Sequence, residues 1–83
     1  MGGYTDLKRR KMLKLLSWLS TQESFVVSTG GRHQWVVKHE KWQRPFAVPF
    51  KHNTINKFIV KALMDKVVST GVCTREDFEQ RLK

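Results

Sequence analysis

This chain has few of the residues that mark secreted or membrane proteins. It contains one cysteine, Cys73, which cannot form an intrachain disulfide, so we expect a reducing compartment such as the cytoplasm. No apolar run approaches the roughly 20 residues that span a bilayer. The first residues also lack the apolar core of a signal peptide. The sequence therefore predicts no membrane association.

Acidic residues are scarce as well. The 83 residues include 7 Asp and Glu against 16 Lys and Arg, which gives a formal net charge of +9. An excess of this size in so short a chain predicts a polyanionic partner. The length suffices for one small domain, and we expect residues 1–83 to form it.

The N-terminal half predicts a helix followed by strands. Between Thr5 and Ser20, apolar residues recur at helical spacing, which indicates an amphipathic helix. Short β-branched or alternating runs predict strands over 25–27, 33–39 and 44–48, the last ended by a proline. Alternation places Trp35 and Val37 on one side of the second strand and Val36 on the other. These three strands are expected to form an antiparallel meander.

The C-terminal half predicts two helices. Thr54 is the expected N-cap of an amphipathic helix that ends near Gly71. Thr74 and Asp77 then have the spacing of a capping box, which predicts a short terminal helix as far as Leu82. The expected fold is α+β in the order α-β-β-β-α, with a three-stranded antiparallel sheet and a short C-terminal helix. Two amphipathic helices would cover one face of the sheet.

Nine basic residues are candidates for binding phosphate groups. The alternative for each is an ordinary solvated surface charge. Five belong to the first predicted helix and four to the strands and their connections: Lys8, Arg9, Arg10, Lys11, Lys14, Arg32, Lys38, Arg44 and Lys51.

His33 is the candidate for proton transfer. It follows Gly30 and Gly31, a pair that predicts a hairpin turn because glycine accepts the positive φ angles of such turns. Imidazole titrates near neutrality, so a histidine among Arg32, Lys38 and Arg44 suits acid or base chemistry at a phosphate. The competing interpretation is a surface or hydrogen-bonded structural histidine.

Neither a metal site nor a cofactor site is predicted. His33 and His39 would lie about 20 Å apart along one strand, too far to share an ion, and only the fold could bring His52 close to either. Cys73 is interpreted as a structural thiol rather than a nucleophile.

Several short motifs, taken in order, resemble the HicA family of small bacterial toxins. They are a Lys-x-Leu-Lys-Leu-Leu pattern in the first helix, the run 31–35 (Gly-Arg-His-Gln-Trp), the run 48–52 (Val-Pro-Phe-Lys-His) and the ending 74–78 (Thr-Arg-Glu-Asp-Phe). The resemblance extends from about Met12 to Leu82. It implies a fold related to double-stranded-RNA-binding domains, ribosome-independent cleavage of mRNA without a cofactor, and neutralisation by a HicB-type antitoxin.

The resemblance carries a functional role to a single residue. The family commonly has Gly-Ser-His-His at the hairpin, which Gly31 and His33 match, whereas Arg32 and Gln34 replace the serine and the second histidine. Two alternatives remain open beside the endoribonuclease. One is a non-catalytic RNA-binding module, in which Trp35 or Trp42 could stack on bases. The other is a domain whose basic face docks an acidic protein.

Overall fold

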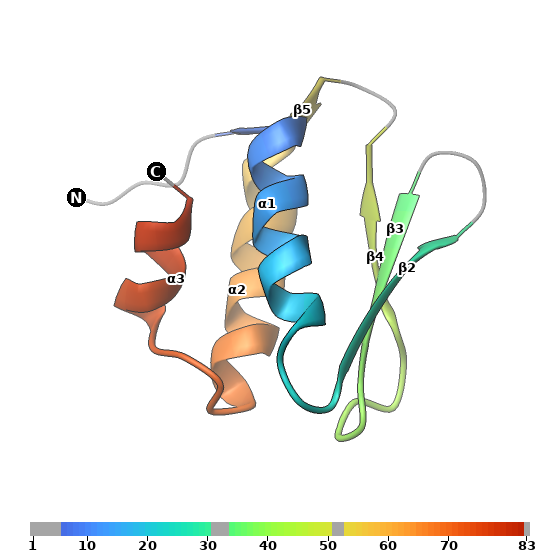
Figure 1. Ribbon diagram of the computed structural model, residues 1–83. Coiled ribbons are helices and arrows are strands. Elements are labelled where there is room, and N and C mark those ends of the chain that lie inside the picture. The colour runs from blue at the N-terminus through green and yellow to red at the C-terminus, as the bar shows by residue number, and fades with distance from the viewer. Residues whose placement is uncertain (1–5, 31–33, 51–52, 83) are drawn as a thin grey trace.

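The computed structural model describes residues 6–30, 34–50 and 53–82, which form an α+β fold (Figure 1). One helix is followed by a three-stranded antiparallel sheet and two C-terminal helices, as predicted, and two short strands add a second ladder. In chain order the elements are β1 (Leu7–Lys8), α1 (Arg9–Ser20), β2 (Phe25–Gly30), β3 (Gln34–His39), β4 (Phe46–Pro49), β5 (Thr54–Ile55), α2 (Lys57–Ser69) and α3 (Arg75–Arg81).

The first helix buries the apolar stripe that its spacing predicts. Met12, Leu15, Leu16 and Leu19 are all at most 1% exposed. The predicted start near Thr5 is wrong, because Leu7 and Lys8 are extended and pair with Ile55 and Thr54. This pairing buries the side chain of Leu7 in the core and delays the helix to Arg9.

The sheet has the order β2-β3-β4, so β2 and β4 are its edges. Val27, Val37 and Phe46 are register partners, as are Trp35 and Val48. Val37 and Val48 are fully buried, which identifies their side of the sheet as the inner face. Val26 lies on the opposite, open face and is 57% exposed. Tertiary packing thus decides the facing of β3, which alternation alone leaves undecided.

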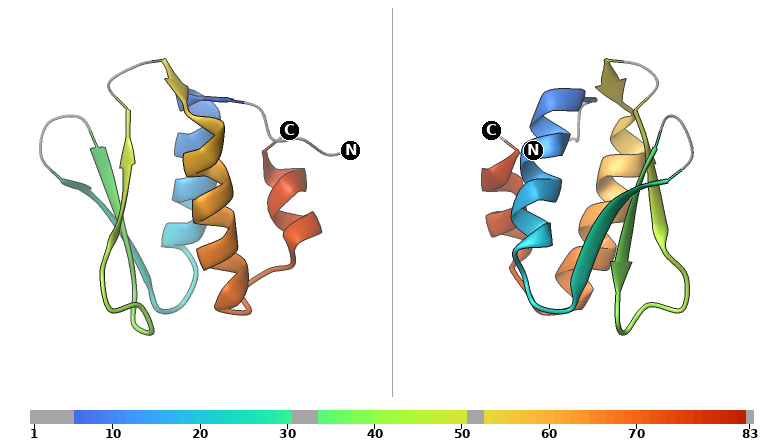
Figure 2. Two further views of the ribbon diagram at one scale, coloured as in Figure 1. Left: turned by 180° about the vertical axis from the view of Figure 1, so that it is seen from behind. Right: turned by 45° about the vertical axis from the view of Figure 1, so that its right-hand side comes forward.

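The layers follow from these faces. α1 and α2 lie against the inner face of the sheet, and α3 lies on the far side of the two helices from the sheet (Figure 2). Phe78 of α3 is fully buried and joins the same core. No described element covers the open face. The prediction that two helices cover one face is confirmed.

Two predicted boundaries shift. The expected N-cap Thr54 is wrong, because Thr54 pairs with Lys8 and the cap is Asn56, whose Oδ1 accepts a hydrogen bond from Phe58 N at 2.8 Å. The third strand begins at Phe46 rather than Arg44, next to Pro45, which has no N–H to offer a ladder.

The ends of the C-terminal helices agree with the predictions. α2 ends just before Gly71, whose φ is +84°. The capping box is present at the start of α3. There the Thr74 hydroxyl accepts from Asp77 N at 3.1 Å, and the Asp77 carboxylate accepts from Thr74 N at 3.3 Å.

Candidate nucleic-acid interface

The segment predicted to carry proton-transfer chemistry is only partly described. Arg32, His33 and Lys51 lie outside the described residues. Their flanking strands are clear: Gly30 pairs with Gln34, and Gln34 pairs with Pro49. The end of β2, the start of β3 and the end of β4 therefore lie side by side at one end of the sheet (Figure 1).

Gly30 is needed there for a reason other than the predicted one. It lies within the extended strand and does not have a positive φ. A Cβ atom at this position would overlap Cγ2 of Val36 on the neighbouring strand. Glycine therefore lets the Val36 side chain lie across the end of β2.

The N-terminus of α1 lies at this same end of the molecule (Figure 1). Arg9 N donates to the Asn53 carbonyl at 2.8 Å, and the Arg9 guanidinium donates to the Phe50 carbonyl at 3.0 Å. The Asp6 carboxylate accepts a hydrogen bond from Lys57 N at 2.9 Å, so the start of α2 is bonded to the residue that precedes β1. These bonds hold the start of α1 against the connection that follows β4.

Three basic residues gather around a hollow at this point. Lys8, Arg9 and Arg10 line it together with Asn53 and Thr54, and its volume is about 340 Å³. All five residues are exposed, and none of the described residues that line the hollow is acidic. We call Lys8, Arg9 and Arg10 the basic pole.

The helix adds to the positive field of the basic pole. The first turn of α1 has no acidic residue, and Lys8 at the N-cap makes no side-chain capping bond. The unpaired N–H groups of a helix start carry partial positive charge and favour anions. The arrangement is chemically suited to a phosphate group.

The structure does not bring the other predicted cations to this place. Lys11 and Lys14 lie further along α1, the first half-buried and the second exposed. Lys38 lies on the open face of β3. Arg44 belongs to the connection after β3, at the opposite end of the sheet from Gly30 and Gln34. Strand direction thus separates Lys38 and Arg44 from the paired strand ends Gly30 and Gln34.

Trp35 and Trp42, the two candidates for stacking on bases, each pack against another ring. Trp35 lies with its ring centroid 4.5 Å from that of Phe50. Trp42 packs edge-on against Phe25 at 5.7 Å, and Lys66 lies over its ring. Both tryptophans are half-buried beside the core rather than standing free for stacking on bases.

His39 takes part in the same ring cluster. Its ring lies 4.5 Å from that of Phe25, and its Nδ1 accepts a hydrogen bond from Lys41 N at 3.0 Å. A histidine held by packing and a backbone hydrogen bond has a structural role. The sequence pattern did not reveal this cluster, because its members come from two strands and a connection.

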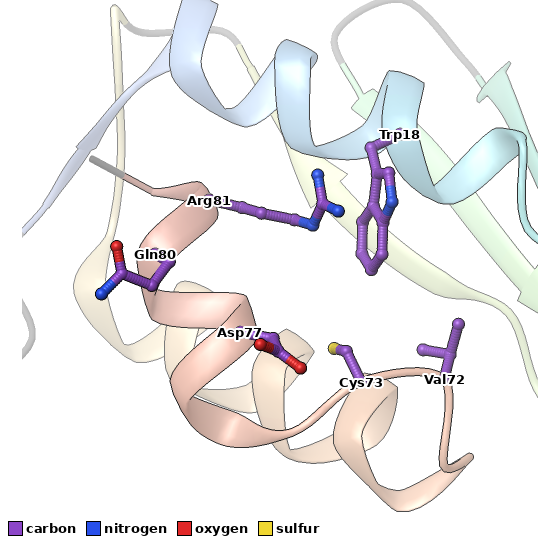
Figure 3. A pocket seen from close by; sticks show the side chains of 6 residues that line it. All are labelled: Trp18, Val72, Cys73, Asp77, Gln80 and Arg81. Atoms are coloured by element: carbon purple, nitrogen blue, oxygen red, sulfur yellow. The ribbon is translucent and has the colours of Figure 1, made fainter.

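Cys73 lies in a second hollow, of about 380 Å³, between α1 and α3 (Figure 3). The Arg81 guanidinium lies over the Trp18 ring at 3.8 Å there. Burial raises the pKa of the Cys73 thiol, and the nearby Asp77 carboxylate raises that pKa further, against the opposing effect of Arg81. The thiol therefore stays protonated near neutral pH, as expected for a structural cysteine.

The described residues offer neither a metal site nor a membrane-spanning helix. Among residues 6–30, 34–50 and 53–82, no group of three or more His, Cys, Asp or Glu side chains could hold a metal ion. No helix in this part of the chain is long and apolar enough to cross a membrane. No protein-family model matches the chain, and no curated protein or solved structure is significantly similar to it.

Proposed function

We propose that this chain is a metal-independent endoribonuclease that cleaves mRNA, with His33 as its proton-transfer residue. One observation carries the proposal. The basic pole lies at the same end of the molecule as the paired strand ends Gly30 and Gln34, and His33 belongs to the segment that joins them. The α+β order and the motifs that resemble the HicA family support the same function.

The chemistry needs little beyond a base, an acid and cations. RNA carries its own nucleophile, the 2′-hydroxyl, which attacks the adjacent phosphorus once a base removes its proton. An acid then protonates the departing 5′-oxygen. His33 would perform one of these proton transfers, and the residues of the basic pole would bind backbone phosphates and orient the strand. The products would be a 2′,3′-cyclic phosphate and a 5′-hydroxyl.

A non-catalytic RNA-binding module is the second candidate. The observation that favours it is that Lys8, Arg9 and Arg10 line the basic hollow without a histidine among the described lining residues. The replacement of two family-typical residues by Arg32 and Gln34 also favours binding without cleavage.

The deciding experiment compares the wild-type chain with His33→Ala. Each protein is incubated with end-labelled single-stranded mRNA in EDTA, and both fragment size and end chemistry are analysed. We expect cyclic phosphate ends with the wild type, no cleavage with His33→Ala, and equal RNA affinity for both. His39→Ala is the matched control, because that imidazole packs against Phe25 away from the hairpin end, and it should still cleave.

Other outcomes would reject the assignment. Cleavage that persists in His33→Ala would show that another group transfers the proton. Intact RNA that still shifts in a binding gel would establish the binding module.

The proposal extends to a protein partner and a location. A HicB-type antitoxin would neutralise such an enzyme in the cytoplasm, and the charge of +9 favours an acidic protein. Co-purification of an acidic protein that stops the cleavage would support this part of the proposal. Failure of every acidic candidate from the same operon to inhibit would count against it.

A further inference from the structure

β2 is an edge strand without a charged residue or a proline. Its six residues are Phe25–Gly30. The other edge, β4, differs, because it follows Pro45 and ends at Pro49, neither of which can donate a backbone hydrogen bond. Proteins normally block open edges with charges, prolines or bulges, so an unblocked edge invites another strand.

The hydrogen-bond pattern shows which groups of β2 are available. Glu40 N donates to the Ser24 carbonyl, so Ser24 and Glu40 form a hydrogen-bonded pair. Such pairs alternate along an antiparallel ladder, so Val26 and Ser28 also bond to β3. The backbone N–H and C=O groups of Val27 and Thr29 then point away from β3. Within the described part of the chain they have no backbone partner.

A groove of about 230 Å³ runs beside this edge. Its lining is apolar or small and polar, without a charged residue, and comes from α1, β2 and β3: Leu13, Leu16, Ser17, Ser20, Val27, Ser28, Thr29 and Trp35. Leu13 is 49% exposed, and on the open face of the sheet Val26 is 57% exposed. The free backbone groups of Val27 and Thr29 therefore have an exposed apolar side chain on each side of the sheet, Leu13 on one and Val26 on the other.

The positive charge beside the groove indicates which kind of partner binds there. Arg10 and Lys14 lie on the same side of α1 as Leu13 and Ser17 by helical spacing, and both are exposed. A second copy of the chain would bring two such basic flanks together, and its own β2 contains no acidic residue to offset them. The geometry and the charge favour a strand with acidic side chains.

We propose that the β2 edge binds an extended acidic peptide segment of a partner protein, which adds a fourth strand to the sheet. Backbone groups of the segment pair with Val27 and Thr29. Side chains on one face of the segment reach Leu13 and the cations of α1, and those on the other face pack over Val26. This site shares Arg10 with the basic pole, but its backbone pairing lies on β2 and does not depend on the proposed RNA cleavage.

A titration with a designed peptide tests the proposal. The probe is a short peptide of alternating glutamate and valine, added to the full ¹⁵N-labelled chain. We expect shifts of the Val27, Thr29 and Leu13 amide signals and protection of the Val27 and Thr29 amides from hydrogen exchange. The same peptide N-methylated at every residue keeps its charge but cannot pair in either strand direction, and should bind at least about tenfold more weakly.

Thr29→Pro and Thr29→Ala form the matched pair of variants. The Thr29 N–H points away from β3, so proline removes a donor of the edge without removing a bond of the β2–β3 ladder. Thr29→Pro should lose peptide binding, whereas Thr29→Ala should keep it. Both should retain the wild-type RNA affinity, which separates this test from that of the proposed function.

Three results would overturn the proposal. The first is no binding of the peptide. The second is equal binding of the N-methylated peptide, which would show attraction by charge alone. The third is self-association of the wild-type chain that Thr29→Pro abolishes, which would make a second copy the occupant.

Discussion

At the scale of single residues, Ser24 stands out for its backbone. Its φ of +73° is the only positive value among the described non-glycine residues. The left-handed region costs an L-residue about 1 kcal/mol relative to glycine. The hydroxyl of Ser24 bonds to the Glu40 carboxylate, which offsets part of that cost.

This geometry gives a prediction for two substitutions. Ser24→Ala keeps the unfavourable φ and loses the bond to Glu40, whereas Ser24→Gly loses the bond but relieves the backbone. We therefore expect Ser24→Gly to be more stable than Ser24→Ala by about 1 kcal/mol in urea unfolding. Equal stability of the two variants would show that residue 24 does not hold a positive φ in solution.

Cys73 gives a prediction about pH. Burial raises the pKa of its thiol in the folded chain above the ordinary value of 9.0. The unfolded chain therefore loses this proton first as the pH rises, so the contribution of the thiol to stability is complete below about pH 9 and is lost above it. In urea melts at increasing pH, Cys73→Ala should lose less stability above about pH 9 than the wild type. An equal loss of stability in both proteins above about pH 9 would contradict the raised pKa of the Cys73 thiol.

At the scale of elements, the capping box of α3 was predictable from two residues. In this box the side chains of a threonine and an aspartate three positions apart each accept a hydrogen bond from the backbone N–H of the other residue. No other part of the fold takes part in these two bonds. The start of α2 was not predictable in this way. Thr54 has the chemistry of a cap, but pairing with Lys8 across the chain engages its backbone in a strand.

The capping box also gives a quantitative expectation. Thr74→Ala removes the acceptor for Asp77 N and should cost about 1 kcal/mol of unfolding free energy. Thr74→Ser keeps the hydroxyl and should remain close to the wild type. Urea unfolding of the three proteins measures this difference, and an equal loss in both variants would assign the effect to the threonine methyl group instead.

At the scale of the whole molecule, cations lie at both ends of the sheet. The basic pole lies at one end, and Arg44, in the connection between β3 and β4, lies at the opposite end. A polyanion bound at one end should respond to cations there and little to those at the other end.

Salt dependence of RNA binding tests this polarity. The double substitution Lys8→Ala and Arg10→Ala should flatten the plot of log affinity against log salt by about 1.4, because each phosphate contact on a single strand contributes roughly 0.7. Arg9 is left intact because it bonds to the Phe50 and Asn53 carbonyls. Arg44→Ala is the control and should leave the slope unchanged. An equal change of slope per cation removed at both ends would mean that RNA is attracted by the net charge of the chain rather than bound at the basic pole.

Local patterns by themselves determined much of this protein. The apolar stripe of α1 and the strand around Val37 follow from the periodicity of the sequence, and the capping box at Thr74 follows from two residues three positions apart. The net charge also follows from composition alone. These features predicted the element order and a polyanionic partner.

Only the tertiary structure decided the arrangement of the candidate sites. The pairing of Leu7 with Ile55 joins residues 48 positions apart and brings the basic pole to the hairpin end. Strand direction sends Arg44 to the other end, and packing decides which face of the sheet the helices cover. Such outcomes depend on which distant surfaces bury each other, and no single segment contains that information.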